Sequence, residues 1–228
     1  MFALTPLETE AIRLSLLVSA WAVLGSLPFG IACAWLLARV SFPGKVLVDG
    51  LIHLPLVLPP VVVGYGLLVG LGRRGPIGSR LFDWFGITLS FNWKGAALAS
   101  AVIAFPLLVR AIRLSIEAVD PKLEQAARTL GAGPFRTFFR ITLPLMMPGL
   151  IAGIVLSFAR SLSEFGATIT FVSSIPGETR TLPLALYALT QTPDGEAQAF
   201  RLCVISVLLA LAALVGSEIL SKWMTKRA

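Results

Sequence analysis

Groups capable of acid–base chemistry are scarce in this sequence. The single histidine, His53, stands near the end of an apolar run, and Glu164 is the only acid close to the interior of such a run. Hydrolysis there would need a nucleophile beside a base, or two neighbouring carboxylates. These residues supply neither arrangement, so we expect no catalytic residue and no enzymatic activity. An interfacial position suits His53 better than a proton relay.

A polar cluster around residue 160 interrupts an apolar stretch. Arg160 and Glu164 are four residues apart, a spacing at which helical side chains meet, so they are predicted to form an ion pair. The alternative is that Arg160 remains free to attract an anion. Gly166 leaves backbone N–H groups accessible nearby. The same stretch carries five hydroxyl side chains: Ser157, Ser161, Ser163, Thr168 and Thr170.

The composition places these groups in a chain that is solvated largely by lipid. Of the 228 residues, 56% are hydrophobic and 14% are charged, with a mean hydropathy of +0.85. In soluble domains about 45–50% of the residues are hydrophobic and about 25% are charged. The net charge of +7 would suit nucleic acid. However, the Lys and Arg residues stand between apolar runs, where topology determinants are expected. We therefore expect the bilayer, and no nucleic acid, as a partner.

Five apolar stretches have the length to cross a bilayer, which takes about 20 residues. The third is short, but Lys94 and Arg110 at its ends can extend to the two interfaces and lengthen it. Cys33 and Cys203 lie inside apolar stretches and are expected to be buried thiols, with no disulfide and no metal site. The sequence predicts an all-α integral membrane protein, with residues 1–228 as one transmembrane domain. The expected spans are about 14–38, 51–72, 95–112, 141–160 and 201–219.

Prolines and glycines are concentrated in the second of these stretches, over residues 54–64. A proline inside a helix frees a backbone carbonyl and bends the helix. In lipid the freed group must be satisfied by neighbouring helices or by water. Two interpretations remain open: the bends serve helix packing alone, or they shape a helix that lines a path. Pro59, Pro60 and Gly64 are the candidates for the second role.

The distribution of basic residues predicts the topology. An odd number of spans places the termini on opposite sides. The side of the C-terminus and of residues 110–140 carries eleven Lys and Arg residues, and the other side carries eight. The positive-inside rule assigns the richer side to the cytoplasm and the N-terminus to the outside. Arg73 and Arg74 on the outer side oppose this trend. They would attract an anion, bind a partner protein or remain solvated.

The predicted cytoplasmic segment 117–144 reads as two short amphipathic helices separated by glycines and a proline. Asp120 is placed to cap the first helix, with Pro121 at its first position and Glu124 in its first turn. One small, apolar face follows from the helical spacing, and such a face suits docking in a groove of another protein. A helix packed on its own loop fits equally well. The face consists of Leu123, Ala126, Ala127 and Leu130.

This segment resembles the EAA loop of importer-type ATP-binding-cassette (ABC) permeases. The pattern of that loop is Glu-Ala-Ala, three residues, Gly, nine residues, Ile, any residue, Leu-Pro. The place of its Glu holds Gln125, with Glu124 one position earlier, which puts in doubt any role that needs a carboxylate at 125. Six positions match at the same spacing: Ala126, Ala127, Gly131, Ile141, Leu143 and Pro144.

Further stretches resemble sulfate/molybdate-type importer permeases, so that the resemblance covers essentially the whole chain. The stretches are 51–65, 122–132, 160–172 and 175–181. The run Glu-Phe-Gly-Ala that starts at Glu164 is shared with sulfate permeases, whereas 175–181 and Gly-Arg-Arg-Gly at 72–75 favour molybdate. The resemblance implies a type I ABC importer permease fold and molybdate as cargo, with sulfate, thiosulfate or tungstate as the alternatives.

The resemblance also implies partners: a second copy of this chain, two ABC ATPase subunits and a periplasmic molybdate-binding protein. The chain has no G-x-x-x-x-G-K-[S/T] loop, so ATP and Mg are expected on the ATPase subunits and no cofactor in this chain. The expected location is the bacterial inner membrane, with transport by alternating access between inward-open and outward-open states.

Two sets of site residues follow. The resemblance assigns coupling to the ATPase to Glu124, Gln125, Ala126, Ala127, Gly131, Ile141, Leu143 and Pro144. A dianion in a region of low dielectric needs donors or water around it, which favours a hydrated path over a tight charged site. The path candidates are Pro59, Pro60, Gly64, Arg160, Ser163, Glu164 and Gly166.

Overall fold

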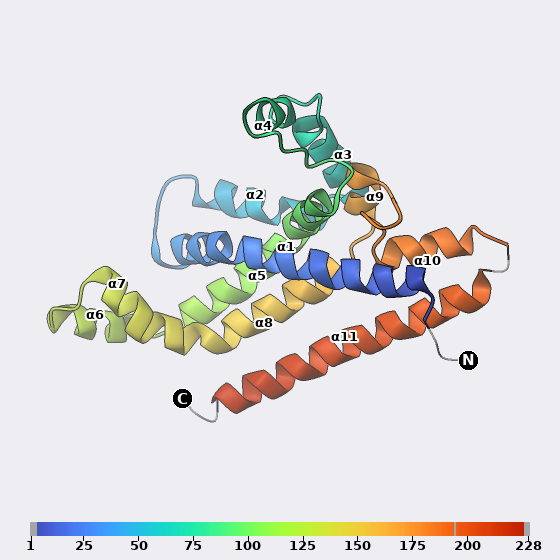
Figure 1. Ribbon diagram of the computed structural model, residues 1–228. Helices are drawn as coiled ribbons and strands as arrows, with labels where there is room; N and C mark the ends of the chain where they lie inside the picture. Colours follow the sequence, from blue (N-terminus) through green and yellow to red (C-terminus); the bar gives the residue numbers. More distant parts are fainter. Residues whose placement is uncertain (1–3, 194, 226–228) are drawn as a thin grey trace.

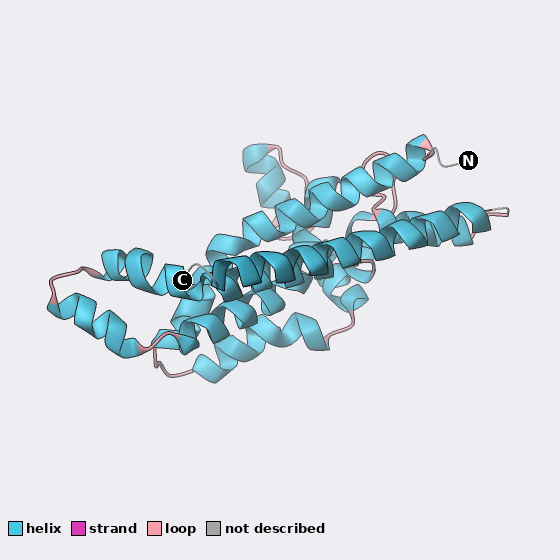
Figure 2. Cartoon of the chain, turned by 90° about the horizontal axis from the view of Figure 1, so that it is seen from below, coloured by secondary structure: helices cyan, strands magenta, loops and turns pink. Residues whose placement is uncertain are grey.

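The structure is a computed structural model that describes residues 4–193 and 195–225, and all regular secondary structure in these ranges is helical (Figures 1 and 2). This confirms the predicted all-α fold. The elements are α1 (Pro6–Arg39), α2 (Lys45–Val57), α3 (Pro60–Leu71), α4 (Gly78–Phe85), α5 (Trp93–Ala118), α6 (Pro121–Thr129), α7 (Pro134–Thr137), a π-helical segment η1 (Phe138–Thr142), α8 (Leu143–Leu162), α9 (Gly166–Val172), α10 (Leu182–Thr190) and α11 (Glu196–Thr225).

Three long helices, α1, α5 and α8, pack on one another and form the core. Buried apolar side chains from all three meet there, among them Leu37, Ile112 and Met146. At the contact of α8 with α5, a Cβ atom on Gly149 would overlap the Ser115 hydroxyl. Small residues of this kind let helices approach closely in lipid, where burial of apolar surface drives association only weakly.

Within the described residues, four helical stretches are long and apolar enough to cross a membrane: Pro6–Arg39, Trp93–Ala118, Pro134–Leu162 and Glu196–Gly216. A fifth crossing arises if α2 and α3 together count as one broken span. The count of four or five agrees with the predicted number. The expected span 51–72 is not one continuous helix, however, because α2 and α3 meet at an angle of 112°.

The break between α2 and α3 follows from two consecutive prolines. Leu58 and Pro59 are extended, with ψ angles of 143° and 131°. Proline disfavours the helical region for the residue before it, and Leu58 and Pro59, each followed by a proline, both leave that region. Single prolines have no such effect here, since α1 continues through Pro28 and α5 through Pro106. Pro60 then occupies the first position of α3, where its missing N–H is not needed.

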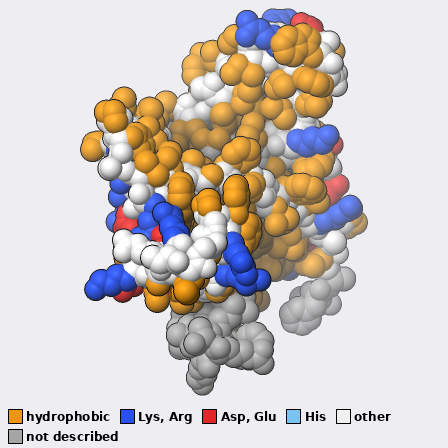
Figure 3. Space-filling model, turned by 90° about the vertical axis from the view of Figure 1, so that its left-hand side faces the viewer, with side chains coloured by type: hydrophobic (Ala, Val, Ile, Leu, Met, Phe, Trp, Pro, Cys, Tyr) orange, Lys and Arg blue, Asp and Glu red, His pale blue; other side chains and the backbone are white. Residues whose placement is uncertain are grey.

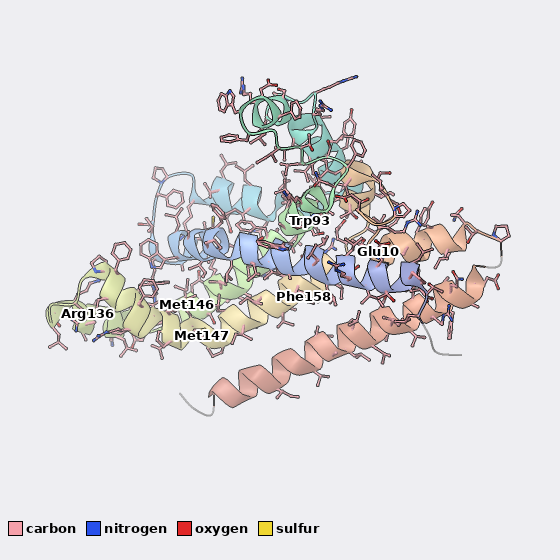
Figure 4. All side chains as sticks on the ribbon, viewed as in Figure 1. Glu10, Trp93, Arg136, Met146, Met147 and Phe158 are labelled. Carbon is pink, nitrogen blue, oxygen red and sulfur yellow. The ribbon has the colours of Figure 1, made fainter. Side chains whose placement is uncertain are left out.

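The two ends of the molecule carry different elements. α6 and α7 lie at one end, together with the C-terminal end of α11, and the start of α1 lies at the other end with the α10–α11 turn (Figures 1 and 2). Arg136 and Glu10 mark these two ends in Figure 4. Seen from the α6–α7 end, hydrophobic side chains cover much of the surface, and Lys and Arg side chains lie both at its edges and in the lower part of this face (Figure 3). This arrangement places segment 117–144 opposite the N-terminus.

Candidate functional site

α6 begins where its sequence predicts. The Asp120 carboxylate accepts a hydrogen bond from the backbone N–H of Lys122 at 2.9 Å, and Pro121 is the first helical residue. A side-chain cap of this kind satisfies one of the backbone donors that a helix leaves unpaired at its N-terminus. Asp120 and Pro121 thereby fix the start of the helix just beyond the end of α5.

Gly131 ends α6 in a left-handed conformation, with φ of +83°. Its N–H donates to the carbonyl of Arg128, and the Ala132 N–H donates to the carbonyl of Ala127, both at 3.0 Å. These two bonds form a Schellman motif, which requires a positive φ at the residue after the helix cap and so favours glycine. No atom lies near the position of a Cβ on Gly131. Glycine is therefore favoured at this position by the backbone conformation, and not by a lack of space for a side chain.

The predicted apolar face of α6 is turned outward. Leu130 is 88% exposed, Leu123 is 47% exposed, and Ala126 is exposed as well. Phe135 in α7 adds a second large apolar side chain at 80% exposure. The alternative of a helix packed on its own loop is therefore wrong. An exposed apolar surface of this kind marks a site that binds another protein or the membrane.

Glu124 is the coupling candidate that faces inward, at 9% exposure. Its carboxylate accepts hydrogen bonds from the Arg39 guanidinium at 3.1 Å and from the Thr142 hydroxyl at 2.8 Å. Arg39 also donates to the carbonyl of Val119 at 3.0 Å. Glu124 thus connects α6 to the end of α1 and to the end of η1, directly before α8. We call this set of contacts the Glu124 latch.

The second short helix of the predicted segment is not separate from the following span. α7, η1 and α8 continue one another, so that a single helical stretch runs over Pro134–Leu162. Ile141 lies in its π-helical part, and Leu143 and Pro144 open α8. The sequence correctly predicts the break at Gly131 and Gly133, but not the continuity that follows. No loop therefore separates α7 from α8.

The path candidates gather at the turn between α8 and α9. The predicted ion pair is confirmed: an Arg160 nitrogen lies 2.8 Å from a carboxylate oxygen of Glu164. The other oxygen of Glu164 accepts a hydrogen bond from the backbone N–H of Ala167 at 2.8 Å, at the start of α9. Glu164 is 2% exposed. A buried carboxylate that binds both a guanidinium and a helix N-terminus holds this turn in one conformation.

α3 packs closely on α9 at this turn. A Cβ atom on Gly64 would lie 2.5 Å from the carbonyl oxygen of Ala167, and one on Gly166 would lie 2.9 Å from the Pro60 side chain. The prolines that break the α2–α3 helix and the turn that follows Glu164 are therefore in contact. Both interpretations of the prolines retain support, because the bend serves this packing and also brings α3 to the path candidates.

The predicted hydroxyls differ in their exposure. Ser157, Ser161 and Thr168 are buried within the protomer. The Thr170 hydroxyl donates to the carbonyl of Gly166, and the Ser163 hydroxyl donates to that of Arg160. Pro59 and Ser163 are the path candidates classed as exposed on the surface of the protomer.

Sequence reasoning missed a charged network that connects α2 with α5. The Asp49 carboxylate lies 3.1 Å from Arg113 and 3.2 Å from His53, and Arg113 also pairs with Glu117 at 2.8 Å. The i,i+4 spacings of Asp49 with His53 and of Arg113 with Glu117 are visible in the sequence. The contact between Asp49 and Arg113 is not, because it depends on how the two helices pack.

Comparison with known proteins shows the family of this chain and several similar proteins. Residues 26–226 match the family described as "Binding-protein-dependent transport system inner membrane component". The chain belongs to this family. "Molybdenum transport system permease protein ModB" of Escherichia coli K12 is 67% identical over 225 residues, which cover 99% of this chain and 98% of that protein. The protein of that name from Haemophilus influenzae is 62% identical over 97% of this chain and 96% of its own length. "Sulfate transport system permease protein CysW" of Synechocystis is 37% identical, over 93% of this chain and 76% of that protein.

Solved structures show that this family member has the fold of type I ABC importer permeases. A bacterial ABC transporter that imports alginate matches with a TM-score of 0.72 at 19% identity, over 98% of this chain and 80% of that chain. The MetNI methionine ABC transporter in an inward-facing conformation matches with a TM-score of 0.69 at 14% identity, over 95% and 94%. At these identities the likeness concerns the fold alone, and it agrees with the fold predicted from the sequence.

The contact of α3 with α9 gives a first prediction for this permease. We expect Gly64→Ala to lower the stability of the detergent-solubilised protein by about 1–3 kcal/mol, because the new methyl group overlaps backbone atoms that have no room to move. Gly66→Ala in the same helix is the matched control, since no atom lies within 4 Å of its Cβ position. Thermal unfolding of both variants is the measurement. Equal unfolding temperatures would show that α3 does not pack on α9 as described.

Proposed function

We propose that this chain is the membrane-spanning permease subunit of an ATP-driven molybdate importer, with its N-terminus in the periplasm and its C-terminus in the cytoplasm. Molybdate is supported by the two ModB proteins, which are 67% and 62% identical to this chain over nearly their whole lengths. Two cyanobacterial sulfate permeases at 37% and 40% identity support a second candidate, an importer of sulfate or thiosulfate. Tungstate, another tetrahedral dianion, belongs with molybdate.

The outward-facing apolar surface of α6 is the observation that carries the proposal. A separate ATPase subunit binds this surface, and ATP and Mg bind that subunit, because this chain has no phosphate-binding loop of its own. α6 then acts as a lever. The Glu124 latch and the continuous helix from α7 into α8 pass its displacement to the turn at Glu164. Closure of the ATPase subunits thereby rocks the spans between inward-open and outward-open states.

The path runs between two copies of this chain. Pro59 and Ser163 are exposed on the protomer beside the α8–α9 turn, and Val61 and Tyr65 on α3 are more than half exposed. A second copy covers this surface and completes the path. Arg160 is paired with Glu164 and is therefore not free to bind the anion. Neutral hydrogen-bond donors, including water, solvate the anion along the path instead. A periplasmic binding protein delivers the anion in this proposal, which the words "binding-protein-dependent" in the family description support.

Purification with the ATPase that co-elutes, followed by reconstitution in liposomes, tests the proposal. We expect ATP hydrolysis and anion uptake to rise several-fold with a molybdate-loaded periplasmic binding protein. Stronger stimulation by a sulfate-loaded binding protein would favour the second candidate. A chain that co-elutes with no ATPase would contradict the assignment of α6.

The ion pair at the α8–α9 turn gives a prediction on transport. We expect Arg160→Gln to lower uptake roughly fivefold, because it leaves the buried Glu164 carboxylate unpaired and costs about 1 kcal/mol or more. The double variant Arg160→Gln/Glu164→Gln should be less impaired, since an amide at 164 still accepts the Ala167 N–H bond. Initial uptake rates of the two single variants and the double variant form a double-mutant cycle. Equal losses in all three would show that the residues have separate roles.

A further inference from the structure

A second polar site lies away from the α8–α9 turn, at the far end of α3. A pocket of about 530 Å³ is enclosed by the turn that follows α3 and by the extended residues that precede α5. Arg73 and Arg74 line it from the first segment, and Thr88, Ser90 and Phe91 line it from the second. α4, which connects the two segments, stands beside α3 at the edge of the molecule (Figure 1).

The turn that presents the two arginines is tightly folded. The Gly75 N–H donates to the carbonyl of Gly72 at 2.8 Å, and a Cβ on Gly75 would overlap the carbonyl oxygens of the last turn of α3. The Arg73 guanidinium lies 4.3 Å from the centre of the Phe82 ring, which orients it by a cation–π contact. Two adjacent cations therefore line one pocket, and the Phe82 ring orients that of Arg73.

Neither arginine forms an ion pair with a carboxylate in the described ranges, 4–193 and 195–225. Arg39, Arg113, Arg160 and Arg201 in the bundle each do so. From residue 72 to residue 92 the chain carries three arginines against one aspartate. The local charge is thus positive, and it is not neutralised by the pocket itself, which no acidic side chain lines.

The two hydroxyl residues that line the same pocket also have side chains without a hydrogen-bond partner in the described ranges. The side chains of Thr88 and Ser90 form no hydrogen bond with any residue that the structure describes, although Ser90 is only 8% exposed. Phe91, next to Ser90, has a φ of +60°, a conformation that is strained for a residue with a bulky side chain. Strain of this kind persists where surrounding structure fixes the backbone, often at binding sites.

We propose that this pocket is a receiving site of low affinity for a tetrahedral oxyanion, at which the anion pauses between the binding protein and the path. Guanidinium groups match the geometry of oxyanions, and two hydroxyls add neutral donors. The pocket is larger than one such anion, so water shares it, and the anion is free to leave. α3 has this pocket at its C-terminal end and the path candidates Pro60 and Gly64 in its N-terminal half. The assignment rests on the proposed function, which places this end of α3 at the periplasm.

Selective chemical labelling tests whether the pocket attracts anions. In the complex reconstituted in liposomes, with Cys33 and Cys203 replaced by serine, Thr88→Cys would report on the pocket. We expect a negatively charged methanethiosulfonate reagent to react roughly tenfold faster than a positively charged one, because fixed charge concentrates counter-ions.

Arg73→Gln/Arg74→Gln should abolish the difference. Arg80→Gln, which removes a charge from α4 outside the pocket, should retain it. Sodium molybdate should slow the reaction more than sodium chloride does at equal ionic strength. A preference that survives the double substitution, or equal effects of the two salts, would overturn the proposal.

Transport kinetics separate an anion site from a surface that binds the periplasmic protein. With the loaded binding protein at saturation, we expect Arg73→Gln/Arg74→Gln to lower the maximal uptake rate several-fold, with an unchanged half-saturating concentration of the binding protein. A raised half-saturating concentration with an unchanged maximal rate would assign the arginines to protein docking and overturn the proposal. If the unsubstituted complex imports no molybdate, the proposed function itself fails. The labelling experiment, repeated with sodium sulfate, still decides whether the pocket receives oxyanions.

Discussion

Replacing Gly131 with valine is expected to lower molybdate uptake at least about tenfold while the chain stays in the membrane at its normal level. A β-branched side chain opposes a φ of +83°, at a cost of about 1–3 kcal/mol. α6 would then lose the two hydrogen bonds of its Schellman motif, and its last turn, with Leu130, would be displaced. A displacement that costs about 1.4 kcal/mol of the productive ATPase contact already accounts for a tenfold loss.

The neighbouring glycine supplies a matched control for this experiment. Gly133 has an ordinary φ of −68°, and no atom lies near its Cβ position. Gly133→Val should therefore leave uptake within about a factor of two, and Gly131→Asn should be intermediate, because asparagine tolerates the left-handed region. Uptake, ATP hydrolysis and membrane content are measured together. Normal uptake by Gly131→Val would show that the shape of this turn does not matter for coupling.

Local features of segment 117–144 were predictable because each depends on residues close in sequence. Asp120 and Pro121 specify the start of α6, and Gly131 specifies its end, through backbone conformations that few other residues adopt. The apolar face of α6 follows from helical periodicity. Its outward direction did not follow, because periodicity identifies a face and not the element against which it lies.

Features that depend on tertiary packing could not be predicted from the sequence. The prolines at 59 and 60 predict a bend within the span 51–72, but neither the angle of 112° nor the packing of α3 on α9 follows from the sequence. The partner of Glu124 is Arg39, 85 residues away, and no spacing rule connects the two. The pair Arg160–Glu164 was predictable for the opposite reason, since the two residues are only four apart in the sequence, although Glu164 lies in the turn that follows α8 and not in the helix itself.

The Glu124 latch changes how the segment relates to the EAA pattern. The carboxylate here stands one position before the place of the pattern's Glu, and it is directed into the protein. Gln125, which takes that place, is exposed. The two positions thus have different surroundings: Gln125 lies on the exposed surface that we propose binds an ATPase subunit, and Glu124 holds α6 against α1 and the end of η1, directly before α8. Without such a hold, movement of α6 would be absorbed at the joints on either side of it.

Glu124→Ala is therefore expected to uncouple the permease, with uptake per ATP hydrolysed reduced at least about tenfold. The Arg39 and Glu124 side chains are only 15% and 12% exposed, and breaking such a pair costs up to about 3–5 kcal/mol because the remaining charge stays buried. Glu117→Ala is the matched control, since its carboxylate is 40% exposed and its partner Arg113 also pairs with Asp49. An exposed pair contributes about 0–1 kcal/mol, so uptake should change little.

Glu124→Gln separates a mechanical role from a purely electrostatic one. The amide carbonyl still accepts a bond from Arg39 or Thr142, so we expect this variant to retain part of the coupling that Glu124→Ala loses. A rigid connection depends more on the hydrogen bonds of residue 124 than on its charge. For that reason we expect Glu124→Gln to be more active than Glu124→Ala. If Glu124→Ala were to keep normal uptake per ATP, α6 would not need its hold on α1 and α8. The force from the ATPase would then have to enter the bundle through α7 and α8 alone.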